Sequence, residues 1–166
     1  QEIKKQFYCE FADLLSYCDT DYIRDHLKEV QDSVNDEVQL IPLYVEYWKM
    51  QRYIPEVARI EQLLDASLSQ NNRDAHIKLL DFLLINNKNT EVYAYLDERK
   101  FLFKEDVNYL QIAIEAGFSP ELFLRYEEEY EGNLQYYCLC DKYLHESDKQ
   151  EKNYPELALN AFFNEP

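Results

Sequence analysis

Residues 106–122 read DVNYLQIAIEAGFSPEL, and they give a clear indication of a helical fold. Apolar residues recur at helical spacing from Val107 to Ile114, which gives the segment one apolar face. Gly117 suits the left-handed conformation that commonly follows a helix. Ser119-Pro120-Glu121 has the N-cap residue, the first-turn proline and the first-turn acid of a new helix. The stretch therefore predicts the end of one helix and the start of the next.

The same helical spacing extends along the chain on both sides of this stretch. Helices are expected over residues 3–18, 20–34, 42–53, 55–68, 73–85, 90–96, 106–116, 120–131, 134–145 and 155–162. Polar runs at 69–72, 86–89 and 146–153 predict loops. Two short runs, 92–95 and 100–103, resemble strands, but an isolated pair of strands is marginal, so Phe101 and Phe103 are expected to fill a corner between helices. The prediction is an all-α protein.

The starts of the expected helices are regularly spaced. One set begins near residues 42, 73, 104 and 133, at intervals of 31, 31 and 29 residues. The alternate set begins near residues 20, 55, 90, 120 and 155, at intervals of 35, 35, 30 and 35 residues. A helix–turn–helix unit that repeats at this period is typical of a solenoid. We expect a single domain, residues 1–166, built as an array of about five helical hairpins; the alternative is an irregular helical bundle.

The segment Asp106 to Tyr126 resembles the junction between two units in degenerate helical-hairpin repeats. The period lies close to those of ankyrin and tetratricopeptide repeats. The ankyrin Thr-Pro-Leu-His sequence is absent, and the single tryptophan, Trp48, stands outside the tetratricopeptide pattern. The resemblance is therefore to an architecture, an ankyrin- or tetratricopeptide-like α-solenoid without a matching consensus, and it implies no catalytic residue.

Composition excludes several classes of function. The 166 residues carry 17 basic and 33 acidic side chains, a net charge of −16, which disfavours direct binding to nucleic acid because phosphate contacts need Lys and Arg. The two glycines, Gly117 and Gly132, cannot supply a glycine-rich phosphate loop. A hydrophobic content of 46% is too high for a disordered acidic tail. We expect no membrane segment, no signal peptide and a cytoplasmic location with free thiols.

The densest charge run is Glu127-Glu128-Glu129-Tyr130-Glu131. Four carboxylates in five positions repel one another, so most of them are expected in solvent. They are either one solvated face of a helix or a docking strip for a basic partner. The excess of negative charge over the whole chain favours the docking strip, because such a field speeds association with a cationic protein.

Tyrosines provide a second indication of a binding surface. Tyr44 and Tyr47 share a helix face with Trp48, Tyr126 precedes the acidic run, and Tyr130 lies within it. Tyrosine and tryptophan combine a large apolar body with a polar group, which suits both repeat cores and binding sites. We expect some of these rings to be structural and some to contact a partner.

The best arrangement for chemistry is Cys138, Asp141 and His145, which share one helix face at i, i+3 and i+7. A structural zinc site needs four converging ligands, and the sequence offers no second cluster. We therefore expect no metal and no cofactor, with the cysteines in the core.

The sequence predicts a non-enzymatic interaction module with an acidic, Tyr-rich surface that binds a basic protein and no small-molecule substrate. The partner-binding candidates are Glu127, Glu128, Glu129, Glu131, Tyr126, Tyr130, Tyr44, Tyr47 and Trp48. One alternative is an immunity or inhibitor protein that blocks a basic toxin or nuclease site by charge mimicry. A second alternative is an enzyme whose Cys, His and carboxylate groups meet only in the folded chain.

Overall fold

The computed structural model describes residues 21, 22, 24, 25, 27 and 36–164. The predicted helix over 3–18 lies outside these residues. Within the predicted helix over 20–34, the described positions are helical.

All regular structure in the described residues is helical, with no β-strand, so this part of the chain confirms the all-α prediction. None of these helices is long and apolar enough to cross a membrane. The chain divides into two compact units, residues 1–86 and 87–166, each described by itself. The first contains η1 (Glu37–Leu40), α3 (Ile41–Gln51), α4 (Val57–Ser69) and α5 (Arg73–Ile85); the second contains α6 (Asn89–Asp97), η2 (Lys100–Lys104), α7 (Val107–Ala116), η3 (Pro120–Tyr126), α8 (Leu134–Tyr143) and α9 (Tyr154–Asn164).

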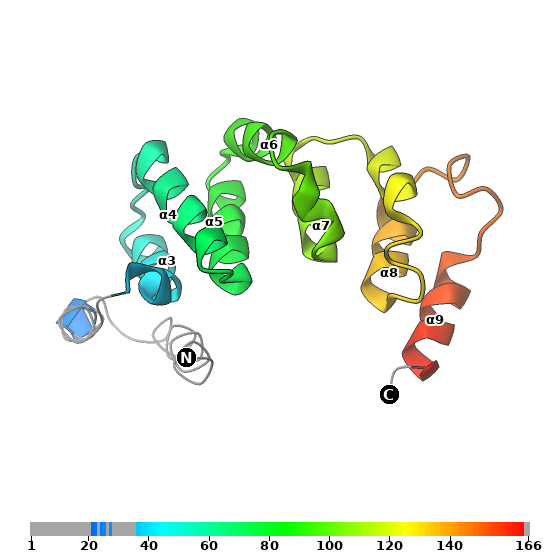
Figure 1. Ribbon diagram of the computed structural model, residues 1–166, viewed down its shortest axis with the longest axis horizontal. Helices are drawn as coiled ribbons and strands as arrows, with labels where there is room; N and C mark the ends of the chain where they lie inside the picture. The colour runs from blue at the N-terminus through cyan, green and yellow to red at the C-terminus, as the bar shows by residue number, and fades with distance from the viewer. Residues whose placement is uncertain (1–20, 23, 26, 28–35, 165–166) are drawn as a thin grey trace. The chain divides into compact units, whose positions relative to one another are not determined.

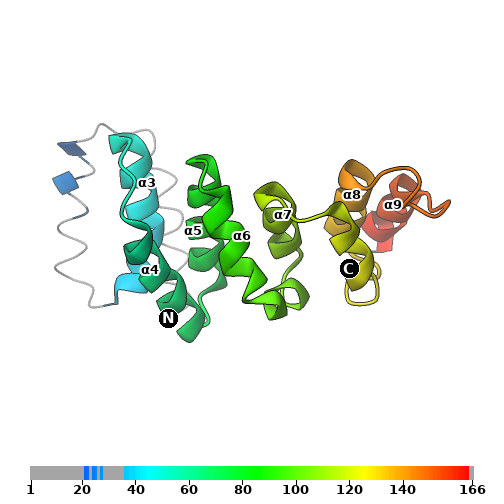
Figure 2. The ribbon, with the colours of Figure 1, turned by 90° about the horizontal axis from the view of Figure 1, so that it is seen from above.

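In the first unit, α5 packs against both α3 and α4 (Figures 1 and 2). The core is formed by fully buried aliphatic side chains such as Leu43, Ile60 and Leu80. Three polar side chains, Ser67, Asn72 and His76, are buried with them, and the first two make local hydrogen bonds. The Ser67 hydroxyl donates to the Leu63 carbonyl at 2.7 Å, and the Asn72 side chain accepts from the Ala75 N–H at 3.2 Å, which caps α5.

In the second unit, sequential helices pack in pairs, α6 with α7 and α8 with α9 (Figure 1). Leu110 and Ala113 of α7 are fully buried, as are Phe103 of η2 and Phe123 of η3. Ala158 and Ala161 are buried on α9, which packs closely on α8. Phe103 therefore fills a corner between helices as expected.

Phe101 differs from that expectation. Its side chain is 56% exposed, because η2 turns Leu102 and Phe103 into the core and leaves Phe101 on the outside.

The helix boundary around Gly117 follows the sequence prediction. Asp106 caps α7 by accepting a hydrogen bond from the Asn108 N–H at 2.9 Å, and Gly117 ends the helix at φ 116°. At this φ a side chain would be strained, so glycine is required here.

The predicted α-helix over 120–131 is wrong. The chain forms a 3₁₀ helix over Pro120–Tyr126 and then hydrogen-bonded turns to Gly132. Ser119 occupies the N-cap position, but its side chain makes no capping hydrogen bond. The physical reason for the early end is charge. An α-helix continued to residue 131 would place four glutamates beside the negative end of its dipole and beside one another.

Candidate functional site

The acidic run, residues 127–131, lies in the turns that join η3 to α8. We call it the acidic segment. Its conformation is held by two tyrosines. The buried Tyr130 hydroxyl donates to the Phe103 carbonyl, and the Gly132 N–H donates to the Tyr137 hydroxyl at 2.8 Å. The carboxylates of the acidic segment are therefore presented on an ordered turn.

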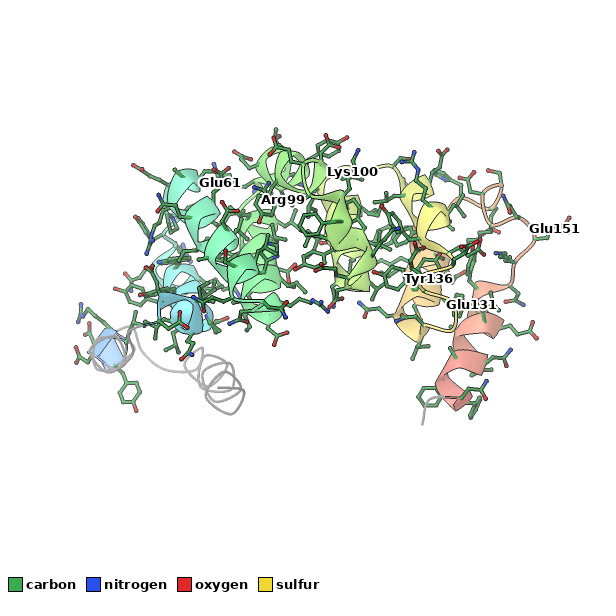
Figure 3. The ribbon with its side chains drawn as sticks, viewed as in Figure 1. Glu61, Arg99, Lys100, Glu131, Tyr136 and Glu151 are labelled. Carbon is green, nitrogen blue, oxygen red and sulfur yellow. The ribbon has the colours of Figure 1, made fainter. Side chains whose placement is uncertain are left out.

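The acidic segment forms one wall of a groove of about 590 Å³, and the other walls come from α9, from Tyr137 of α8 and from the loop that precedes α9. Glu127, Glu128 and Glu131 line it from one side and Glu156 of α9 from the other. Figure 3 labels Glu131, which lies near α9. We call this cavity the acidic groove.

The floor and rim of the acidic groove are not purely charged. Tyr137 and Leu157 provide apolar surface, and Asn153 and Asn160 provide amide groups. A groove with carboxylates, one aromatic ring and aliphatic surface suits a side chain with a long apolar stem and a cationic head. Lysine and arginine are the side chains of that kind.

Lys152 already lies in the acidic groove, where its ammonium pairs with Glu127. The loop that carries it is anchored by Lys149, whose ammonium is 2.9 Å from Glu146 and 3.2 Å from Asp141. The hydrogen bond to Glu146 and the nearby Asp141 charge raise the pKa of Lys149, so this anchor stays charged at neutral pH.

The remaining groove carboxylates have no such partner. Among the described residues, no basic nitrogen lies within 4.0 Å of the carboxylates of Glu128, Glu131 or Glu156. Glu129 is different, because it does not line the acidic groove and pairs with Lys104 at 3.4 Å. The structure therefore places three of the four predicted glutamates in the groove and directs Glu129 elsewhere.

The predicted aromatic candidates do not all lie on a surface. Tyr126 is half-buried, and Tyr130 is a core residue with 8% exposure. Trp48 is also buried, with its ring 5.7 Å from that of Tyr44 and 5.5 Å from that of Phe82. Tyr130 and Trp48 thus pack inside their units, which removes them from the candidate surface.

Tyr44 and Tyr47 are half-buried in the first unit, whereas the acidic groove belongs wholly to the second. The candidate site is therefore confined to the second unit.

The sequence predicts that Cys138 and Cys140 both lie in the core, and this prediction is correct only for Cys140. Cys138 is exposed and Cys140 is fully buried. Within the part of the chain that the structure describes, no three His, Cys, Asp or Glu side chains converge as metal ligands.

Cys140 lies in the α8–α9 interface beside the hydroxyls of Tyr136 and Tyr154 (Figure 3 labels Tyr136). Burial raises the pKa of the Cys140 thiol to about 11 and that of the Tyr154 hydroxyl to about 12. The Tyr136 hydroxyl donates to the Phe123 carbonyl at 2.8 Å, and burial also raises its pKa. All three groups are protonated at neutral pH, which suits a packing role and not a nucleophilic one.

Comparison of the chain with protein-family models, curated proteins and solved structures finds no match. Function is therefore inferred from the geometry of the acidic groove.

The sequence prediction missed the groove residues contributed by Tyr137, the loop before α9 and α9 itself. Glu156 and Asn160 stand one helical turn apart, which marks a polar face of α9. Nothing local indicates that this face lies opposite the acidic segment.

Proposed function

We propose that the protein is a non-enzymatic interaction module that binds a basic segment of a partner protein in the acidic groove. The observation that carries this proposal is the set of three groove carboxylates, Glu128, Glu131 and Glu156, none of which has a basic nitrogen of the described residues within 4.0 Å. Unpaired carboxylates around a partly apolar groove are complementary to lysine and arginine side chains. The net charge of −16 would steer such a partner toward the protein.

An ordered groove favours binding because little conformational entropy is lost when the partner docks. The Tyr130 and Tyr137 hydrogen bonds and the Lys149 anchor supply this order on both sides of the groove. Affinity is expected to fall steeply as salt rises, because the charges are at the surface and are screened.

The inhibitor alternative uses the same groove. Carboxylates that are not neutralised internally resemble the phosphates that a nuclease site binds, so a basic nuclease is one form of basic partner. This version predicts tight, stoichiometric inhibition, whereas a general adaptor binds short basic segments with modest affinity.

The experiment is fluorescence anisotropy with a labelled Lys/Arg-rich peptide at low and physiological salt. Replacing Glu127, Glu128, Glu131 and Glu156 by Gln should weaken binding roughly ten-fold or more at low salt, since each exposed pair contributes about 0.2–1 kcal/mol. The matched control replaces Glu56, Glu61, Glu91 and Glu121 by Gln, which changes the net charge equally outside the groove. Equal losses in both variants would show that the groove is not the site.

We also propose that the hairpins stack into one α-solenoid. The pairing of α6 with α7 and of α8 with α9, together with the regular spacing of helix starts, supports this arrangement.

A further inference from the structure

The outer face of α9 is apolar and uncovered. Leu159, Phe162 and Phe163 are 55%, 58% and 73% exposed, although they belong to one helix. We call these three residues the apolar stripe. A second face of α9, with Tyr154, Ala158 and Ala161, is buried. An ordinary surface helix has one apolar face, and α9 has two.

The apolar stripe is continuous with the acidic groove. At 100° per residue, Phe163 lies about 20° around the helix from Glu156, which lines the groove. Leu159 and Phe162 continue the stripe away from the groove, and the Phe162 and Phe163 rings contact each other edge to face at 5.6 Å. One groove carboxylate, Glu156, and two exposed aromatic rings therefore adjoin on one helix.

Charge complementarity selects the occupant of this combined surface. A purely apolar partner would bury Glu156 and its neighbours without a cation, which is costly. A second copy would bring two acidic grooves together, and an anionic lipid surface would repel the same carboxylates. Apolar side chains flanked by lysine or arginine satisfy both parts of the surface.

We propose that the apolar stripe and the acidic groove form one docking surface for an amphipathic basic segment of a partner protein. The inference rests on the proposed function and adds the apolar component to it. In such a mode, cations of the segment pair with the groove carboxylates while its apolar side chains cover Leu159, Phe162 and Phe163.

The test compares two labelled peptides of the same Leu and Lys composition. One segregates Leu and Lys on opposite faces of a helix, and the other is scrambled. We expect the segregated peptide to bind the full chain roughly ten-fold more tightly or better, because burial of three large apolar side chains adds to the charge contacts. Changing Leu159, Phe162 and Phe163 to Ser should abolish this preference and leave binding of the scrambled peptide unchanged.

The matched control changes Tyr53, Ile54 and Ile85 to Ser, which removes three exposed apolar side chains from the first unit and should preserve the preference. Equal binding of both peptides to the unaltered chain overturns the apolar component and leaves the proposed function standing. Binding of neither peptide overturns both. A third outcome is that the unaltered chain shows no peptide preference but binds phosphatidylcholine vesicles, and that the Ser variant does not bind them. This result would identify the apolar stripe as a lipid contact instead.

Discussion

Lys152 occupies the position that the proposed function gives to a partner. Its ammonium pairs with Glu127 inside the acidic groove, and both side chains remain partly exposed. An exposed ion pair of this kind contributes less than about 1 kcal/mol, so an incoming lysine or arginine can replace it. Lys152 is therefore a competitor within the chain for the site of the basic segment.

We expect Lys152→Gln to bind the Lys/Arg-rich peptide about two- to five-fold more tightly, since Glu127 becomes available. Anisotropy titration measures the change. Lys100→Gln is the matched control, because Lys100 pairs with Asp97 at 3.2 Å and does not line the groove (Figure 3). In a Glu127→Gln background the gain from Lys152→Gln should disappear. If Lys100→Gln tightened binding as much as Lys152→Gln, the change in net charge alone would explain the gain in affinity.

Tyr126 and Tyr130 show that the role of a tyrosine cannot be predicted from its position in the sequence alone. Tyr126 precedes the acidic run and Tyr130 lies within it. Tyr130 is buried and its hydroxyl donates to the Phe103 carbonyl, whereas Tyr126 is half-buried. A tyrosine serves equally well as a core ring with one hydrogen bond or as a surface contact. The choice between these roles depends on which segment packs against it.

At the scale of the element, α8 and α9 line part of the acidic groove and also hold a cluster of groups with raised pKa values. Folding keeps Cys140 protonated to about pH 11, whereas an exposed thiol has a pKa of about 9. Between these values the folded chain holds a proton that the unfolded chain has released. The contribution of Cys140 to the free energy of unfolding should therefore be fully present below about pH 9. It should be lost as the pH rises toward 11.

Urea unfolding followed by circular dichroism from about pH 8 to about pH 11 checks this. We expect the free energy of unfolding of the second unit to fall by on the order of 2 kcal/mol, with Tyr154 and Tyr136 acting in the same direction. Cys140→Ala should flatten the dependence, and Cys138→Ala, at an exposed position, should not. A profile that is the same with and without Cys140 would contradict the interpretation.

The 3₁₀ helix and the turns after it show where local pattern is insufficient. Ser119-Pro120-Glu121 predicts a helix start correctly, but the glutamates that follow oppose the dipole of an α-helix. The turns are stabilised instead by contacts between residues that are more than one helical turn apart in the sequence. These contacts are made by Tyr130, by Tyr137 and by the Lys104–Glu129 ion pair.

At the scale of the whole molecule, the proposed solenoid makes a prediction about dimensions. A compact domain of 166 residues has a radius of gyration of roughly 15 Å. Stacked hairpins are elongated, so small-angle X-ray scattering of the full chain should give a clearly larger value. NMR relaxation should assign one rotational correlation time to both units. A radius near 15 Å would favour the irregular bundle, and two different correlation times would contradict the single-domain prediction.

Local sequence patterns predicted most helices of the described residues and the boundary at Gly117, and composition gave the net charge. These depend on caps, apolar spacing and composition, which act within about one helical turn. Tertiary packing, in contrast, sets three features: Glu156 faces the acidic segment, Tyr130 and Trp48 are buried, and the apolar stripe of Leu159, Phe162 and Phe163 is exposed. The physical reason is that a groove forms between segments distant along the chain, and burial of one face of a helix depends on the neighbour it packs against.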